Sequence, residues 1–109
     1  MITWQDFEKV ELRVGTILQA ISFPEAKKPA FKIQADFGDF GIKWSSAQIT
    51  KIYTLEDLPG RQIIGVINFP AKQIGNFMSE FLITGFQDHN GDVILAMPNF
   101  KVPNGNRLV

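Results

Sequence analysis

The amino-acid sequence predicts an all-β fold. It is a five-stranded Greek-key barrel with a short helix between strands three and four and a short helical turn before strand one. Three observations carry this prediction: short runs of alternating apolar and polar residues recur, glycine and proline separate these runs, and one helical pattern follows the third run. A small closed barrel suits such short strands, because closure hides their edges.

The composition is that of one domain, residues 1–109. The chain of 109 residues is 45% hydrophobic and contains ten phenylalanines, which is enough for one core. Eleven basic and eleven acidic residues give a formal net charge of zero, which disfavours a strong non-specific binder of nucleic acid. There is no signal-peptide pattern and no apolar run of membrane-helix length, so we expect a cytoplasmic protein with no membrane partner.

The first element expected is a helical turn over residues 4–9. Thr3 is a typical N-cap residue, and Asp6 falls near the positive end of the helix dipole. In this turn Phe7 is expected to face the core.

Three strands follow. Alternation predicts the first over residues 10–17, where Gly15 is expected to mark a bulge. The clearest alternation covers residues 31–37, and residues 40–44 are expected to return as its hairpin partner.

The next segment predicts the helix between the third and fourth strands. Ser45 or Ser46 is a suitable N-cap for a helix over residues 47–53. Residues 62–69 then form an almost continuous apolar run, which predicts a fourth strand buried on both faces.

The last strands are expected at residues 80–86 and 93–97. Asn90-Gly91 between them supplies the positive φ angles of a hairpin turn. The tail, residues 98–109, contains two prolines and cannot be a long helix. Five or six short strands with a helix after the third is the order of an OB-type barrel.

No catalytic group of residues is evident, and we expect no enzyme activity, no metal and no cofactor. His89 is the one histidine, in an expected surface turn, and cysteine is absent. No serine, histidine and acid are arranged as a nucleophilic triad, and no glycine-rich phosphate loop occurs.

The segment over residues 66–80 is the most informative in the chain. Ile74, Phe77 and Met78 lie in a polar, glycine-containing connection, where apolar residues either plug the end of the barrel or form a binding surface. Ser79-Glu80 is either a hydrogen-bonded turn or a pair that orients a ligand. Both alternatives stay open at this level.

Basic residues near aromatic ones offer a second kind of contact. Lys43 and Lys72 could lie beside Phe69 or Phe77, where charges bind phosphates and rings stack on bases. The alternative is that the charges face solvent and the rings fill the core. Apolar residues at both termini indicate docking on the barrel or on a second subunit.

Several of these segments together resemble the CsaA proteins, a stand-alone branch of the tRNA-binding-domain family that also forms appended domains of some aminoacyl-tRNA synthetases. The resemblance covers nearly the whole chain. It rests on DFEKVELRVGTI at residues 6–17, FPEA at 23–26, DFG at 36–38, GIKWSSAQIT at 41–50, VINFP at 66–70, SE at 79–80 and VPNG at 102–105.

The resemblance implies an OB-type barrel and a homodimer in which the N-terminal turn and C-terminal tail surround the subunit contact. It also implies a cytoplasmic, export-related chaperone that holds unfolded or precursor polypeptides, with no enzyme activity. Because relatives in the family bind tRNA by its shape, tRNA binding is the alternative function.

The family's binding site is formed by the start of the helix after strand three and by the loop after strand four. Carried over to this sequence, it predicts a site for polypeptide or tRNA at Lys43, Ser45, Ser46, Gln48, Asn68, Phe69, Lys72, Ile74, Phe77, Met78, Ser79 and Glu80. The loop after Phe69-Pro70 is less basic and more apolar than is common among CsaA relatives, which favours apolar peptide over tRNA.

Overall fold

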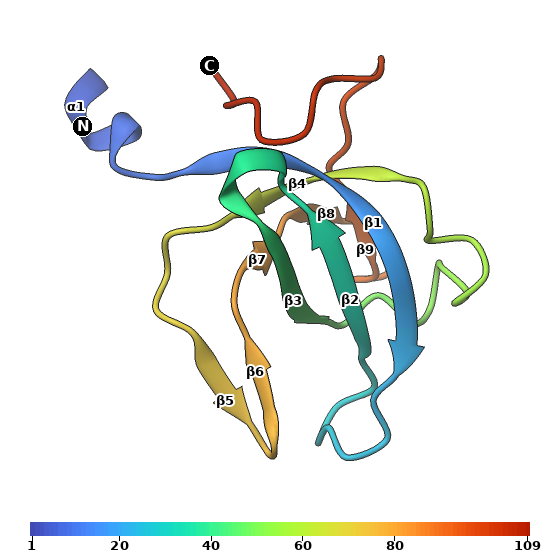
Figure 1. Cartoon of the computed structure of the whole chain (residues 1–109). Helices are drawn as coiled ribbons and strands as arrows, with labels where there is room; N and C mark the ends of the chain where they lie inside the picture. Colours follow the sequence, from blue (N-terminus) through green and yellow to red (C-terminus); the bar gives the residue numbers. More distant parts are fainter.

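A computed structural model describes residues 1–109 and shows a nearly closed, antiparallel β-barrel (Figure 1). Its main sheet has five strands in the order β3-β2-β1-β4-β7, and two small hairpins, β5–β6 and β8–β9, extend from it. The elements are α1 (Trp4–Glu8), β1 (Leu12–Ser22), β2 (Phe31–Asp36), η1 (Gly38–Phe40), β3 (Ile42–Ala47), β4 (Gln62–Val66), β5 (Lys72–Ile74), β6 (Phe77–Ser79), β7 (Leu82–Ile83), β8 (Gly85–Gln87) and β9 (Val93–Leu95). The predicted all-β barrel is confirmed.

The core fills the barrel with alternate residues from each strand. Ile17, Ile33, Phe37 and Ile63 are all completely or almost completely buried. The Phe37 ring meets the Phe81 ring edge to face, with 4.9 Å between centroids. These contacts explain why the alternation in residues 31–37 was a reliable strand signal.

Gly15 makes room for the core; it does not mark a bulge. A Cβ atom at Gly15 would lie 2.7 Å from the Phe37 ring, so only glycine fits beside that ring. The irregularity in β1 falls instead at Leu18, between the paired residues Ile17 and Gln19. The predicted irregularity in this strand is therefore present, but at Leu18 and not at Gly15.

The helix predicted over residues 47–53 is absent. Ala47, Ile49 and Tyr53 are all buried, but β3 ends at Ala47 and the chain turns from Thr50. The Tyr53 N–H donates to the Ile49 carbonyl at 3.3 Å, and no further helical turn follows. The Tyr53 hydroxyl accepts a hydrogen bond from the Leu95 N–H at 3.0 Å, which fixes this segment against β9. Alternate burial at two-residue spacing therefore outweighed the local capping signal of Ser45 and Ser46.

The N-terminal helix forms as predicted, but it does not enter the core. Thr3 and Asp6 make a reciprocal capping box, and α1 buries none of its residues. The Phe7 ring packs instead against the Trp4 ring, with 5.4 Å between centroids. The helix is five residues long, and no helix in the protein has the length and apolarity to span a membrane.

The later strands are shorter than the apolar runs in the sequence led us to predict. The fourth ends at Val66, and the fifth divides into β7 and β8 at Thr84, whose hydroxyl donates to the Ile64 carbonyl at 2.7 Å. The predicted β8–β9 hairpin is present, although only Gly91 in its turn has a positive φ angle. Asn90 keeps a negative φ because the Asp88 carboxylate accepts from its N–H and shapes a longer loop.

The C-terminal tail docks on its own barrel. The N–H of Val14 donates to the Asn106 carbonyl at 2.9 Å, and the N–H of Leu108 donates to the Leu12 carbonyl at 2.8 Å. The tail therefore runs beside β1, and both chain ends lie at one end of the barrel (Figure 1). The β5–β6 hairpin projects from the opposite end (Figure 1).

Candidate functional site

The predicted loop after the fourth strand folds as the β5–β6 hairpin. Lys72 pairs with Ser79, Gln73 with Met78 and Ile74 with Phe77. Gly75, with φ of 60°, supports the turn. The Gln73 side-chain amide donates to the Gly75 carbonyl at 2.9 Å, which fixes the turn from within the hairpin.

The Phe77 ring anchors this hairpin to the barrel. Its centroid lies 5.3 Å from that of Phe23 and 6.2 Å from that of Trp44, both in edge-to-face arrangements. The Lys32 ammonium lies 4.8 Å from the Phe23 centroid and 5.1 Å from the Phe77 centroid, within cation–π range. Phe77 therefore packs on the outer surface of the barrel and does not plug its interior.

Ser79 and Glu80 attach the base of the hairpin to strand β3. The Trp44 N–H donates to the Glu80 carboxylate at 2.9 Å, and the Glu80 N–H donates to the Trp44 carbonyl at 2.7 Å. The Ser46 N–H donates to the Ser79 hydroxyl oxygen at 3.3 Å. These contacts are structural, which is the first of the two alternatives left open by the sequence.

A groove of about 600 Å³ lies between the hairpin, the end of β3 and the start of β7. Phe69 and Leu82 are 56% and 50% exposed, so its apolar side chains are open to solvent. The groove is lined by Ser46, Gln48, Phe69, Pro70, Lys72, Ile74, Ser79, Glu80, Phe81 and Leu82. Seven of the predicted site residues therefore meet here: Ser46, Gln48, Phe69, Lys72, Ile74, Ser79 and Glu80. We call this space the β3 groove.

A second depression, of about 400 Å³, lies beside the same hairpin. It is lined by Ile21, Lys32, Trp44, Asn76, Phe77, Met78 and Glu80, so it contains the predicted residues Phe77 and Met78. Met78 is 46% exposed, and an exposed thioether beside an aromatic ring can adapt to apolar ligands. Two open, partly apolar surfaces thus border one hairpin.

Three predicted residues do not join these surfaces. The Ser45 side chain is 1% exposed, and its hydroxyl donates to the Phe81 carbonyl at 2.7 Å inside the barrel. Asn68 bridges the Lys9 carbonyl and the Glu11 N–H, at 2.7 and 3.0 Å, so it connects β4 to the start of β1. Lys43 pairs with Ala35 and lies on the opposite face of β3 from Trp44 and Ser46.

Sequence reasoning missed several residues on these surfaces, above all Lys32. Lys32 pairs with Ser46 across β2 and β3, so their side chains share one face. Alternation in residues 31–37 separates Lys32 from the apolar face of that strand, but the register that puts Trp44 and Ser46 on the same face as Lys32 could not be predicted from the sequence. Pro70, Phe81 and Leu82 were missed because they adjoin the hairpin only after the chain folds.

The surfaces carry little net charge. Lys72 and Glu80 are the charged residues that line the β3 groove, and Lys32 and Glu80 are those of the second depression. Each surface therefore presents one cation and one anion beside apolar side chains. No group of three or more histidine, cysteine, aspartate or glutamate side chains is placed to hold a metal ion.

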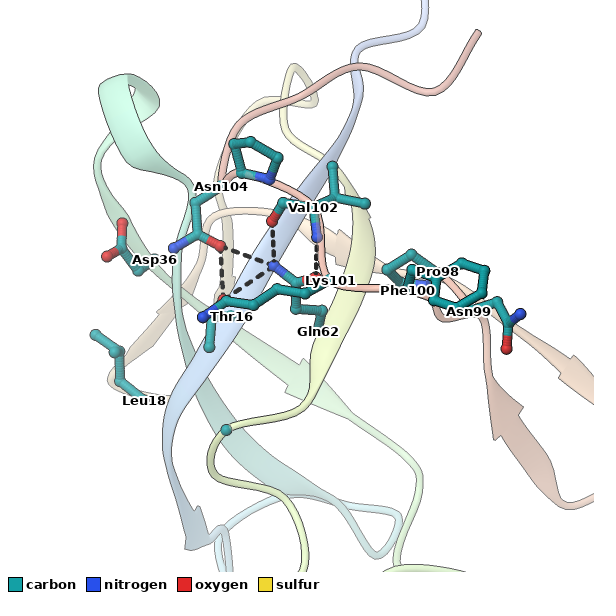
Figure 2. A pocket seen from close by; sticks show the side chains of 12 residues that line it. Thr16, Leu18, Asp36, Gln62, Pro98, Asn99, Phe100, Lys101, Val102 and Asn104 are labelled. Carbon is teal, nitrogen blue, oxygen red and sulfur yellow. Dashed lines mark hydrogen bonds between the residues drawn. The ribbon is translucent and has the colours of Figure 1, made fainter.

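A larger pocket, with a volume of about 880 Å³, lies elsewhere, over β1 and β4. Figure 2 shows that the Gln62 amide lies at its centre, where it donates to the Val102 carbonyl at 2.6 Å and accepts from the Val102 N–H at 2.8 Å. Thr16 donates to the Asn104 side-chain oxygen at 2.6 Å (Figure 2). These bonds hold the tail in place, and no predicted site residue lines this pocket.

The chain ends form a third apolar surface. Trp4 is 66% exposed, and a shallow depression there is lined by Ile2, Thr3, Trp4, Phe7 and Val109. A helix that buries none of its residues and exposes a tryptophan is unusual on an isolated monomer.

Comparison with known proteins identifies the family. The model of the family described as "Putative tRNA binding domain" matches residues 12–107. The chain is 38% identical over 108 residues to methionine–tRNA ligase 1 of Bacillus anthracis, a match that covers 98% of this chain and 16% of the ligase. Among the curated relatives, the methionine–tRNA ligases, the matched part is about 15% of each protein's length.

Solved structures give full-length matches. The crystal structure of the chaperone CsaA from Bacillus anthracis is 47% identical with a TM-score of 0.93, and the match covers 100% of this chain and 99% of that one. The CsaA chaperone protein from Picrophilus torridus is 45% identical with a TM-score of 0.92, and both chains are covered completely. The barrel, the hairpin and these matches agree, and the chain belongs to the tRNA-binding-domain family as a CsaA-like protein.

Proposed function

We propose that this protein is a homodimeric, CsaA-like chaperone that holds unfolded or precursor polypeptides in the cytoplasm and supports their export. The observation that carries this proposal is the pair of open, partly apolar surfaces beside the β5–β6 hairpin. Exposed apolar residues at a groove are typical of surfaces that bind other proteins. The CsaA chaperones that match the full length of this chain support the same reading.

The physical basis is adaptable apolar contact without strong charge. Phe69 and Leu82 offer open apolar area, and Met78 can change its shape to suit different side chains. One cation and one anion on each surface permit polar parts of a client to approach without requiring a charged one. Two such subunits in a dimer would strengthen weak single contacts through avidity.

The test is the suppression of aggregation of a chemically denatured client protein. Phe69→Ala should reduce suppression at least threefold, and the double variant Phe77→Ala with Met78→Ala should do the same. Phe100→Ala is the matched control, because Phe100 is also an exposed phenylalanine, at 80% against 56% for Phe69, and lies outside both surfaces. Unchanged suppression by folded site variants would show that the proposed surfaces are wrong.

A second candidate function is the recognition of tRNA by its shape. It is favoured by the match to the tRNA-binding-domain family and to methionine–tRNA ligases. Lys32 and Lys72 border the two surfaces and could contact phosphates. Binding of bulk tRNA should then fall steeply with salt and weaken in Lys32→Ala and Lys72→Ala; absence of binding at low salt would exclude this candidate.

The proposed dimer contact is the apolar surface at the chain ends. Trp4 is exposed there beside Val109, and burial of such an aromatic residue is a common source of association energy. Sedimentation velocity should show a dimer for the wild-type protein and a shift toward monomer for Trp4→Ala. A wild-type monomer at micromolar concentration would contradict this part of the proposal.

A further inference from the structure

The geometry of β3 points to a specific mode of client binding, and we propose that the β3 groove takes an extended polypeptide segment as an added strand. The contacts are main-chain hydrogen bonds to the Ser46 carbonyl and to the N–H and carbonyl of Gln48. This inference rests on the proposed chaperone function and names the form of client that the groove accepts: extended main chain with apolar side chains at alternate positions.

The first step is that β3 is an edge strand. It pairs with β2 on one side only, and β3 and β7 are the two outer strands of the sheet. Trp44 uses its N–H and carbonyl for Glu80, on the side away from β2. Main-chain groups alternate sides along a strand, so those of Ser46 face the same way as those of Trp44. Gln48, the first residue after the end of β3, is next in this alternation.

The second step is that this edge is open after the Ser46 N–H, which donates to the Ser79 hydroxyl oxygen at 3.3 Å. The Ser46 carbonyl lies 3.3 Å from the Ser45 hydroxyl, but that hydroxyl has one hydrogen and directs it to the Phe81 carbonyl at 2.7 Å. The main-chain N–H and carbonyl of Gln48 make no hydrogen bond within the chain. Unpaired groups at a strand edge are the template for strand addition.

The third step is that the groove beside these groups suits an extended chain. Phe69, Ile74 and Leu82 line it and offer contact to the side chains of an added strand. Because Lys72 and Glu80 balance in charge, the groove favours neutral main chain over the phosphates of nucleic acid. An extended polypeptide satisfies the main-chain groups and the apolar wall together.

The first arm of the test changes only the ligand. The probe is a short synthetic peptide in which valine and leucine alternate with serine and lysine, labelled with a fluorophore. Two N-methylated versions of this peptide are compared, one methylated at the odd-numbered amides and the other at the even-numbered amides. Each version lacks the hydrogen-bond donors on one side of an extended strand. The apolar side chains fix the register, so one methylated peptide should bind at least tenfold more weakly and the other within twofold of the parent peptide.

The second arm changes only the protein. Gln48→Pro removes the free N–H at the groove, and the preceding residue, Ala47, already has the extended conformation that proline requires. Gln48→Ala is the matched control, because it keeps the N–H and removes the side chain. Gln48→Pro should weaken peptide binding at least fivefold, whereas Gln48→Ala should change it less than twofold.

The outcomes separate this inference from the function on which it rests. Equal weakening by both methylated peptides, with the parent peptide still bound, would overturn strand addition and leave the chaperone proposal standing. If neither the parent peptide nor an unfolded protein such as reduced, carboxymethylated lactalbumin binds, both proposals fail. Binding of bulk tRNA in the same assay, with neither polypeptide probe bound, would assign the surface to nucleic acid. If Gln48→Pro does not fold, the methylated peptides still decide the question.

Discussion

Glu80 and Trp44 exchange two hydrogen bonds that join the β5–β6 hairpin to the barrel. The Trp44 N–H donates to the Glu80 carboxylate at 2.9 Å, and the Trp44 carbonyl accepts from the Glu80 N–H at 2.7 Å. A side-chain oxygen thus takes the place of a main-chain carbonyl in a strand pair. The result closes the barrel at Trp44, and the edge of β3 is open only after the Ser46 N–H, which donates to the Ser79 hydroxyl.

Removal of this carboxylate should loosen the hairpin. Glu80→Ala leaves the half-buried Trp44 N–H without its acceptor, so we expect the free energy of unfolding to fall by about 1–2 kcal/mol. Glu80→Gln keeps a side-chain oxygen at the same place and should lose less than about 1 kcal/mol. Urea unfolding measures both values, and limited proteolysis near Gly75 should be faster in Glu80→Ala. Equal stability of the two variants would show that the bond contributes little.

Phe77 and Met78 are adjacent on β6 but should differ in their effect on stability. Phe77 packs against Phe23 and Trp44, so Phe77→Ala should destabilise the protein by about 2 kcal/mol. Met78 is largely exposed, and Met78→Ala should change stability by less than about 0.5 kcal/mol. Thermal denaturation monitored by circular dichroism compares the two variants. A larger loss in Met78→Ala would mean that the hairpin is anchored by its other face.

The sequence was sufficient to predict the barrel because its core strands alternate. Ile33, Ala35 and Phe37 are buried at two-residue spacing, and Ile33 and Ala35 each pair with both β1 and β3. The same spacing continues through Ala47 and Ile49. There a nearby serine resembled a helix cap and predicted a helix, because local signals do not report which residues the core buries.

The sequence predicted which segments of the chain meet at the candidate site, but not which face of its strand each side chain occupies. Residues 66–80 and the end of β3 do come together, because chain order brings a hairpin back to the strand edge. Lys43 was expected at the surface beside the hairpin. The structure instead places Lys32 there, next to the Phe77 ring. Strand register decides the face of each side chain, and a shift of one residue reverses it.

Gly105 should tolerate substitution much less well than Gly60, although their φ angles are nearly equal. Both residues have a positive φ, 92° and 91°, where any other residue is strained. A Cβ atom at Gly105 would lie 2.7 Å from the Phe37 carbonyl oxygen, whereas none of the surrounding atoms lies within 4 Å of one at Gly60. We expect Gly60→Ala to cost about 1–2 kcal/mol and Gly105→Ala about 3 kcal/mol or more.

Chemical denaturation of the two glycine variants gives the comparison directly. The additional loss in Gly105→Ala would report the docking of the tail, since the Gly105 N–H also donates to the Val14 carbonyl at 2.7 Å. Equal losses in the two variants would indicate that the tail moves to accept the methyl group. The tail would then contribute less to the fold than its hydrogen bonds imply.

The ion pairs of Glu11 should make stability depend on pH in the acidic range. Its carboxylate accepts from the Arg13 guanidinium at 2.7 Å and lies 3.1 Å from that of Arg107. The Arg13 hydrogen bond, with the positive charges of Arg13 and Arg107, lowers the pKa of Glu11 below its ordinary value of 4.5, although desolvation opposes the shift. These contacts connect β1 to the tail.

The sign of the effect follows from the lowered pKa. Above pH 4.5 the carboxylate is charged in both the folded and unfolded chains, and the ion pairs contribute their full stability. As the pH falls below 4.5, the unfolded chain takes up a proton first, and the contribution is lost as the pH passes through the pKa of the folded state.

Glu11→Gln carries no such charge, so its unfolding free energy should fall less between neutral and acidic pH. Glu56→Gln is the control, because Glu56 is an exposed carboxylate without an ion pair, and its curve should follow the wild type. Urea unfolding at a series of pH values measures all three proteins, and parallel curves for wild type and Glu11→Gln would show that Glu11 does not stabilise the docked tail.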